Sequence, residues 1–242
     1  MHVALYLTPV PFGRASLENK TVAVIDVLRS STSICAALSA GARGVIPTDG
    51  PGEAGDMWTK IGSEMAILAG ERNGVRIENF QLGNSPAEYT ADTVGGKFVI
   101  TTTTNGTAIF GKAFNAGPVI SAALVNISAA AQRVARENRN LVIVCSGREG
   151  HFSIEDTICG GMLIDLLGER HKKELTLNDA ASLALLLYRD SRHEIRKTIE
   201  QGEHGKYLTS IGFASDVTLA SEVDSIPVLP ILKDGRLILE EN

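Results

Sequence analysis

The sequence predicts an α/β protein with three layers, in which a mostly parallel sheet lies between two layers of helices. Three segments share one local design: a short apolar run rich in β-branched residues, a polar loop of small residues, and a helical pattern. They begin at Thr21, Lys97 and Leu141. Continuous short apolar runs are typical of strands buried on both faces of a parallel sheet. The repetition predicts two similar lobes built from strand–loop–helix units.

The other elements of this α/β pattern follow in chain order. A strand over residues 2–8 should end at the turn signals between Pro9 and Gly13. Further apolar runs predict strands at 23–28, 44–48, 65–70, 98–103, 118–124 and 141–145. Helical patterns follow many of these runs, and we expect helices after Ser30 or Ser31 (either of which could cap the helix), at 51–61, from Gly106, at 127–138 and at 154–167.

The chain changes character near Gly168 and becomes mainly helical. TLND predicts a capped helix start, and further helices are expected at 206–211 and 216–223. Asp234-Gly235 between two apolar runs indicates a hairpin. No low-complexity linker interrupts the sequence, so residues 1–242 should form one unit, with two packed lobes at about 1–120 and 121–242.

Composition narrows the function class. With 242 residues, 44% of them hydrophobic, the chain can bury a sizeable core, and its net charge of −5 disfavours nucleic acid or a membrane surface as partner. The N-terminus lacks the features of a signal peptide, and no apolar run approaches the roughly 20 residues that span a bilayer. The three cysteines, Cys35, Cys145 and Cys159, should be reduced thiols of a cytoplasmic protein.

The loops after the apolar runs predict an anion site. Each loop places hydroxyls, glycines and backbone N–H groups at a helix N-terminus, where unpaired N–H groups and the helix dipole attract negative charge. Several such loops on one sheet edge would hold a small, highly charged anion, with local arginines outweighing the weak negative field of the whole chain.

The loop IDVLRSST contains the first candidate residues. Asp26 lies inside an apolar run, where a carboxylate needs a cation, a metal or several donors. Arg29, Ser30 and Ser31 follow it at the helix start. Asp26 is either a metal ligand or catalytic acid beside an anion-binding turn, or a strand-end carboxylate that pairs with Arg29 and caps the helix.

The run TTTTNGT offers hydroxyl and N–H donors to a phosphate-like group. Its candidate residues are Thr102, Thr103, Asn105 and Gly106. The alternative is an ordinary capped turn. Neither a Walker loop nor a dinucleotide fingerprint is present.

CSGREGHFSIED gathers charge at a third helix start. Arg148 could bind an anion, and Glu155 and Asp156 could serve a Mg²⁺ centre or simply be favourable charge in a first helical turn. Cys145 fits a structural thiol better than a nucleophile, because no histidine is indicated beside it. The histidines His171, His193 and His204 lack metal-ligand spacing and are interpreted as surface residues.

GERNG and LGNSPAEY add further candidates. Glu71 beside Arg72 offers a carboxylate for a metal and a guanidinium for an oxyanion, or else a surface ion pair. Ser85 and Pro86 are explained as a helix cap and first helical residue, which leaves Asn84 as a possible ligand contact.

Taken in order, IDVLRSSTSI, GERNGVRIENFQLGNSPAEYT, TTTTNGT and GREGHFSIEDTICGG resemble the 2-phosphosulfolactate phosphatase (ComB-like) family. The likeness runs from about Ala23 to Gly161 and continues more weakly through IGFASDVTLASEVDSIPVLP. The resemblance implies a three-layer α/β fold of two lobes. It also implies a Mg²⁺-dependent acid phosphatase that converts 2-phospho-3-sulfolactate to sulfolactate and phosphate, a step of coenzyme M biosynthesis in organisms that make it.

The matching positions are carried over onto this chain. They are Asp26, Arg29, Ser30, Ser31, Glu71, Arg72, Gly83, Asn84, Ser85, Thr102, Thr103, Asn105, Gly106, Gly147, Glu155 and Asp156. The stretch with Arg148, Glu149 and His151 differs from the family, and it could contact the part of the substrate beyond the phosphate.

The resulting hypothesis is metal-assisted hydrolysis of a phosphomonoester. Asp26, with Glu71 and Glu155, would hold Mg²⁺ directly or through water, and Asp26 and Asp156 would be the catalytic carboxylates. The attacking group is either water or a carboxylate such as Asp26. A phosphatase for another phospho-hydroxy acid and a non-catalytic anion-binding protein remain as alternatives. The apolar helices after Gly168 could close a lobe or pair two subunits of a homo-oligomer.

Overall fold

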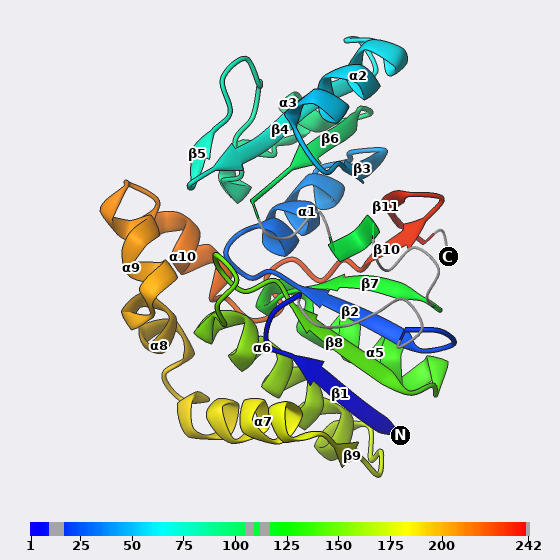
Figure 1. The fold of residues 1–242 in the computed structure, drawn as a ribbon, viewed down its shortest axis with the longest axis vertical. Coiled ribbons are helices and arrows are strands. Elements are labelled where there is room, and N and C mark those ends of the chain that lie inside the picture. The colour runs from blue at the N-terminus through cyan, green and yellow to red at the C-terminus, as the bar shows by residue number, and fades with distance from the viewer. Residues whose placement is uncertain (10–16, 105–108, 112–116, 241–242) are drawn as a thin grey trace.

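One sheet dominates the computed structural model, which describes residues 1–9, 17–104, 109–111 and 117–240. Within these residues it has eleven strands in the order β5-β4-β6-β3-β11-β10-β7-β2-β8-β1-β9 (Figure 1). The strands are β1 His2–Tyr6, β2 Thr21–Ile25, β3 Gly44–Pro47, β4 Ala66–Arg72, β5 Val75–Arg76, β6 Phe98–Thr102, β7 Val119–Ala122, β8 Leu141–Cys145, β9 Thr176–Leu177, β10 Pro230–Lys233 and β11 Arg236–Leu239.

The sheet consists of two parallel groups joined by an antiparallel hairpin. β4, β6 and β3 are parallel neighbours, and so are β7, β2, β8, β1 and β9. The C-terminal hairpin β10–β11 pairs antiparallel with β7 on one side and with β3 on the other. The group that contains β2 and β8 combines strands from both predicted lobes, since β1 and β2 precede residue 120 whereas β8 and β9 follow it.

Helices cover both faces of the sheet, which confirms the predicted three-layer α/β class. Their bounds are α1 Ser30–Ser39, α2 Pro51–Ile61, α3 Ala91–Val94, α5 Ile127–Glu137, α6 Ile154–Asp165, α7 Asp179–Ser191, α8 Ile195–Gln201, α9 Glu203–Ser210 and α10 Ala214–Ala220. Three shorter helical turns are η2 Pro86–Glu88, η3 Leu124–Asn126 and the π-helical η4 Leu166–Arg170.

β2 shows how one strand serves both layers. All five of its residues are buried. Ala23 and Ile25 belong to the core shared with α5, α6 and α7, whereas Val22 and Val24 belong to the core shared with α1. Alternate side chains of a strand point to opposite faces, so a continuous apolar run is what a strand between two helical layers requires.

The observed elements match most of the predicted ones, with two differences near the carboxyl ends of β2 and β4. β2 ends at Ile25, so Asp26 lies just past the strand. β4 continues to Arg72 and forms a small hairpin with β5 that the pattern did not indicate. The expected start of a helix at Gly106 lies outside the described residues.

The predicted serine cap of α1 is wrong. The N-cap residue is Arg29, whose side chain makes no cap hydrogen bond, and the N–H of Ser30 at the helix start donates instead to Asp26 Oδ1 (3.2 Å). The Ser31 hydroxyl instead accepts a hydrogen bond from the Asp26 backbone N–H (3.1 Å), so it fastens the strand end to the helix start.

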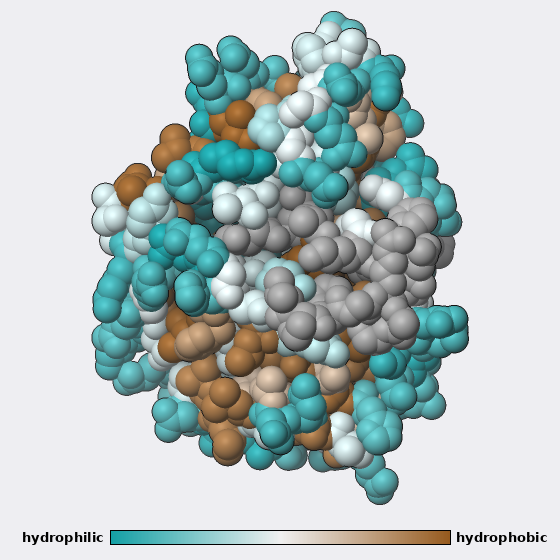
Figure 2. Space-filling model, viewed as in Figure 1, coloured by the Kyte–Doolittle hydropathy of each residue, from teal (hydrophilic) through white to brown (hydrophobic). Residues whose placement is uncertain are grey.

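The C-terminal helices form a separate group at the carboxyl ends of the parallel strands, where α8, α9 and α10 lie side by side (Figure 1). α7 begins at the predicted cap, since the Asn178 side chain accepts from Ala181 N–H (3.0 Å). The hairpin at Asp234-Gly235 is also confirmed. Figure 2 shows apolar side chains gathered over the part of the surface where α7 lies, and Leu183 and Leu186 of α7 are exposed. No helix in the described part of the chain has the length and apolar character to cross a membrane.

Candidate active site

A polar cavity lies where the carboxyl ends of β2, β4, β6 and β8 meet the side of α9. Its volume is about 50 Å³. Its lining consists mainly of polar and charged residues from six separate parts of the chain, namely Asp26, Leu28, Arg29, Glu71, Asn73, Gly74, Asn84, Thr103, Thr104, Arg148, Glu149, His204, Tyr207 and Leu208. Ligand sites of α/β proteins form at this edge of the sheet, because the loops after parallel strands converge there.

Asp26 is buried at the bottom of this arrangement, directly after β2. Its Oδ1 accepts a hydrogen bond from the Ser30 backbone N–H at the start of α1 (3.2 Å). Burial is the largest cause that raises the pKa of Asp26 well above its usual value, and the neighbouring carboxylates of Asp156 and Glu71 raise it further. Three acidic groups within electrostatic reach of one another favour a cation among them.

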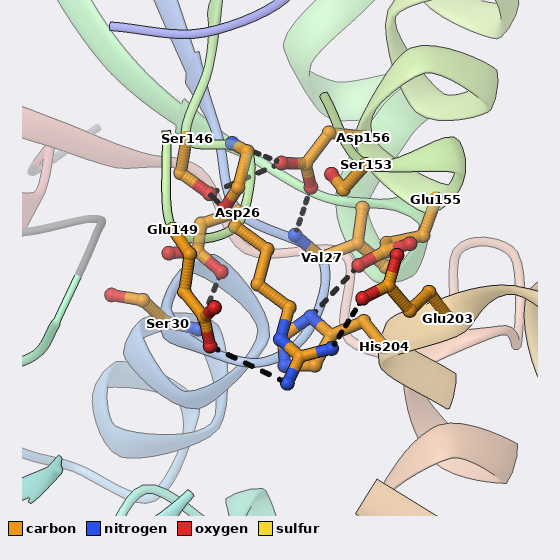
Figure 3. Close-up of polar contacts among 12 residues, drawn as sticks. Asp26, Val27, Ser30, Ser146, Glu149, Ser153, Glu155, Asp156, Glu203 and His204 are labelled. Carbon is orange, nitrogen blue, oxygen red and sulfur yellow. Dashed lines mark hydrogen bonds and ion pairs between the residues drawn. The ribbon is translucent and has the colours of Figure 1, made fainter. Parts of the chain in front are cut away.

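Asp156, in the first turn of α6, is the carboxylate next to Asp26 (Figure 3). Its Oδ1 accepts from Val27 N–H (2.8 Å), and its Oδ2 accepts from Ser146 Oγ and Gly147 N–H (both 3.1 Å). Burial, followed by the charge of Glu155, raises the pKa of Asp156 to about 7. These bonds tie the loops after β2 and β8 together, and Asp156 is not among the described residues that line the cavity.

Arg29 is held by a partner far away in the sequence. Its Nη1 forms a buried ion pair with Asp216 of α10 (2.8 Å), and its Nη2 donates to the Gly74 carbonyl (2.6 Å). The guanidinium also stacks on the Phe213 ring, 4.2 Å from its centroid. The alternative in which Arg29 pairs with Asp26 is therefore wrong, and Arg29 is fixed at the cavity wall by α10.

The Glu71 side chain stabilises the turn between β4 and β5 and links it to the loop after β6. Its Oε2 accepts from Gly74 N–H (2.7 Å), and its Oε1 accepts from Thr104 N–H after β6 (2.8 Å). Gly70 immediately before it has φ +155°, and a Cβ there would lie 2.3 Å from the Thr102 carbonyl oxygen. The sequence Gly-Glu therefore allows β4 to pass close to β6 and places this carboxylate in the cavity.

Glu155, the other acidic residue of the α6 N-terminus, contacts a different partner. Its side chain is 2% exposed, and its Oε1 lies 2.9 Å from Nδ1 of His204 on α9 (Figure 3). Glu155 and His204 line a second cavity of about 230 Å³, which adjoins the first through shared residues Arg148, Glu149 and His204.

Arg148 lies at the junction of the two cavities. Its guanidinium is 4.5 Å from the centroid of the Tyr207 ring, and it forms looser ion pairs with Glu149 and Glu203 (both 3.5 Å). A cation held by an aromatic face and exposed acids is available to an anionic ligand.

The predicted site residues divide into two groups. Asp26, Arg29, Glu71, Asn84, Thr103 and Arg148 line the first cavity. Ser30, Ser31, Arg72 and Thr102 do not line this cavity, and the last three form hydrogen bonds that stabilise the segments around it. The Ser31 hydroxyl also accepts from Ser121 (3.0 Å), and Arg72 donates to the Thr102 hydroxyl (3.1 Å) and to the Glu71 carbonyl. Asn105 and Gly106 lie outside the described residues.

Ser30 differs from these supports because its buried hydroxyl has no hydrogen-bond partner among the described residues. It lies at the start of α1, and it lines a separate cavity of about 10 Å³ whose lining shares only Asn84 with the first cavity.

Sequence reasoning missed three residues of the site. His204 was interpreted as a surface residue, yet its side chain is only 14% exposed. Tyr207 of α9 lines the cavity and donates its hydroxyl to the Asn73 carbonyl (2.8 Å). Asp216 lies in the weakly family-like segment IGFASDVTL, which was the one signal that could have indicated it. Ser85, explained as a helix cap, instead donates its hydroxyl to Asp216 (2.7 Å).

Cys35, Cys145 and Cys159 are all free and buried. Cys145 ends β8, is free and fully buried, and burial raises the pKa of its thiol well above the usual value. A thiol in this state is a poor nucleophile.

The carboxylates of the first cavity could bind a hard cation such as Mg²⁺ if water or substrate oxygens completed its coordination. No three His, Cys, Asp or Glu side chains of the described residues are grouped as a closed metal site. Asp26 and Glu71 nevertheless present carboxylate oxygens to one cavity, and Mg²⁺ is commonly bound through one or two carboxylates, water and substrate oxygens. These residues fit such a site, whereas Glu155 is already paired with His204.

The chain is similar to known proteins over nearly its whole length. The family model described as 2-phosphosulpholactate phosphatase matches residues 6–235. A probable 2-phosphosulfolactate phosphatase of Caldanaerobacter subterraneus subsp. tengcongensis is 35% identical over 97% of each chain. Proteins described in the same words are 34% identical in Clostridium acetobutylicum, over 98% of this chain and all of the relative, and 37% identical in Carboxydothermus hydrogenoformans, over 93% and 92%. The chain therefore belongs to the 2-phosphosulfolactate phosphatase family.

Proposed function

We propose that this protein is a Mg²⁺-dependent phosphatase that hydrolyses 2-phospho-3-sulfolactate to sulfolactate and phosphate. Family membership supports phosphatase activity. The observation that carries the proposal is the first cavity, where the carboxylates of Asp26 and Glu71 share one small polar space with the guanidiniums of Arg29 and Arg148. Phosphoryl transfer needs this combination, because its catalysis consists mostly of positioning and charge stabilisation.

Asp26 and Glu71 are the residues that would hold Mg²⁺. Bound there, the metal would supply positive charge to the phosphoryl oxygens and lower the pKa of a coordinated water. Burial and, after it, repulsion from the carboxylates of Asp156 and Glu71 raise the pKa of Asp26, and a bound cation would relieve that repulsion. Glu155 is left out of this set, because its carboxylate bonds to His204.

Arg29 and the start of α1 would bind the phosphate group. The guanidinium of Arg29 is fixed by Asp216, so it meets an oxyanion without losing side-chain freedom on binding. Thr103 and Asn84 add polar groups to the lining of the same cavity.

The second cavity would take the rest of the substrate. The first cavity has room for little more than a phosphate, whereas 2-phospho-3-sulfolactate also carries a carboxylate and a sulfonate. Arg148 lies where the two cavities join, so it would contact these additional anionic groups.

The chemical role of Asp26 has two forms. Its carboxylate either attacks phosphorus and forms an acyl phosphate, or holds the metal while water attacks. Quenching the reaction with labelled substrate and mapping any phosphorylated peptide distinguishes them: an acyl phosphate on Asp26 identifies the nucleophile.

A substrate panel tests the proposed function. We expect phosphate release from 2-phospho-3-sulfolactate with Mg²⁺ and none with a chelator, with phospholactate and phosphoglycolate as comparison esters. Faster turnover of a comparison ester would reassign the substrate. Tight Mg²⁺-independent binding without phosphate release would instead show an anion-binding protein.

Two further aspects belong to the same proposal. In an organism that makes coenzyme M, the reaction would be a step of its biosynthesis. Three free buried thiols support a cytoplasmic location, where thiols stay reduced.

A further inference from the structure

His204 and Glu155 form a pair that the metal and phosphate contacts do not use. His204 projects from α9, and Glu155 lies in the first turn of α6, 49 residues away in the sequence. The 2.9 Å contact joins Nδ1 to a carboxylate that is almost completely buried, while the histidine lines both cavities (Figure 3). The imidazole thus lies between the cavity of the phosphate and the cavity of the remaining substrate.

The contact with Glu155 determines which ring nitrogen of His204 carries the shared proton. A carboxylate can only accept a hydrogen bond, so Nδ1 carries a proton and donates it to Glu155. Nε2 is then the ring nitrogen left for the cavity. Histidine with one nitrogen oriented by a buried carboxylate and the other facing a ligand is the arrangement required for proton transfer.

Other acids near the cavity are less suited to this role. Asp156 has a raised pKa, but three donors occupy its carboxylate and it lines neither cavity among the described residues. The Tyr207 hydroxyl donates to the Asn73 carbonyl. His151 lines the second cavity but not the first.

We propose that His204 is the general acid of the hydrolysis and that Glu155 is the residue that positions it. This inference rests on the proposed phosphatase function. As the bond between phosphorus and the bridging oxygen breaks, its electron pair remains on that oxygen, and His204 Nε2–H donates a proton to it. The new P–O bond takes its oxygen from water, and the proton that this water gives up restores His204. One ester and one water become one alcohol and one phosphate.

Phosphate esters differ in whether their leaving group must be protonated, and this difference tests the role of His204. An alkyl ester such as 2-phospholactate expels a strongly basic alkoxide, whereas 4-nitrophenyl phosphate expels a stable phenolate without protonation. His204→Asn keeps an N–H close to the Nδ1 position and lacks Nε2. We expect its single-turnover rate to fall about 10²–10⁴-fold on the alkyl ester and less than about 5-fold on the aryl ester.

Glu155→Gln tests the positioning role. We expect the same leaving-group dependence with a smaller loss, because the imidazole remains and only its orientation is weakened. A merely structural role would slow both esters equally. His193→Asn, at an exposed position on the surface, is the matched control and should leave both rates unchanged.

The outcomes separate the two proposals. Wild-type protein that releases no phosphate from any ester would overturn the proposed function and this inference with it. Active wild-type protein with equal losses, or no loss, in His204→Asn would overturn the role of His204 alone. Should the variant not fold, the wild-type enzyme decides: rates that increase steeply with leaving-group acidity across a series of alkyl phosphates would show that no proton is donated.

Discussion

Arg29 and Asp216 are 187 residues apart in the sequence, yet their side chains form an ion pair of 2.8 Å in which both are 2% exposed. Asp216 also accepts from Ser85, so α10 connects the start of α1 with the loop before η2. The helices after Gly168 therefore do more than cover the sheet, since they fix the Arg29 guanidinium at the wall of the first cavity.

The first prediction concerns this ion pair. Asp216→Ala leaves a buried guanidinium without its counter-charge, and breaking such a pair usually costs about 3–5 kcal/mol. We expect the free energy of unfolding, measured by urea denaturation, to fall by about that amount. Asp190→Ala, at an exposed position of α7, is the control. The double variant R29M/D216L should recover most of the stability and none of the activity, whereas an unchanged stability in Asp216→Ala would refute the role of this pair.

Asp26→Asn should abolish turnover and leave the fold intact. Asparagine has nearly the same shape and avoids the burial penalty that raises the pKa of Asp26, so thermal stability should not fall. Loss of a group that contacts the reacting centre should lower kcat by about 10³-fold or more. Steady-state kinetics and thermal unfolding of the same preparation measure both effects. Near-normal turnover would remove Asp26 from the mechanism.

Glu71→Gln should weaken Mg²⁺ binding. The amide can preserve one of the two turn contacts but brings no negative charge to the cavity, so we expect the affinity for Mg²⁺ to fall at least about 10-fold, which is typical of losing a metal-supporting contact. Isothermal titration calorimetry with Mg²⁺ alone measures this without relying on activity. Glu88→Gln is the matched control, because Glu88 also accepts from a turn N–H (Gly83, 2.8 Å) without lining the first cavity. Equal Mg²⁺ affinity in both variants would contradict the assignment.

Stability should decrease as pH rises from about 4 to 7 in metal-free buffer. The folded state holds a proton on Asp156 up to about pH 7, whereas the unfolded chain loses it near the usual value of 3.8. The folded state therefore binds more protons in this window, with a slope approaching about 1.4 kcal/mol per pH unit for one proton. Above pH 7 this contribution is lost completely.

Asp156→Asn should make the same pH dependence shallower. It removes one titrating group and also the charge that is the second cause of the raised pKa of Asp26. Urea denaturation at several pH values in the presence of a chelator measures the slope. A slope equal to that of the wild type would show that other groups control the dependence.

Gly147 and Gly150 provide a test of the loop after β8. Both have positive φ (+61° and +82°), but a Cβ at Gly147 would lie 2.2 Å from the His151 carbonyl oxygen, whereas a Cβ at Gly150 meets nothing within 4 Å. Gly150→Ala should cost about 1 kcal/mol of backbone strain, and Gly147→Ala clearly more, because the loop that donates Gly147 N–H to Asp156 must move. Thermal unfolding of the two variants measures the difference, and equal melting temperatures would refute it.

The sequence by itself determined the fold class, most strands and helices, and the chemical type of the site. Apolar runs such as residues 21–25 and 141–145 predict buried strands because this information is local, and polar residues directly after them lie at the carboxyl edge of a parallel sheet. Asp26, Glu71 and Arg148 were identified in this way.

Only the tertiary structure decided which of these residues face the cavity and which support it. Asp156 and Ser31 appeared equivalent to Asp26 and Arg29 in the sequence, but their hydrogen bonds hold neighbouring loops together. Asp216 comes from a segment with only a weak family likeness and His204 from a helix without metal-ligand spacing, and they lie 187 and 49 residues from the groups they contact. The order of apolar and polar residues along one helix or strand indicates which of its residues are buried. A contact between distant elements forms only when the helices pack against the sheet.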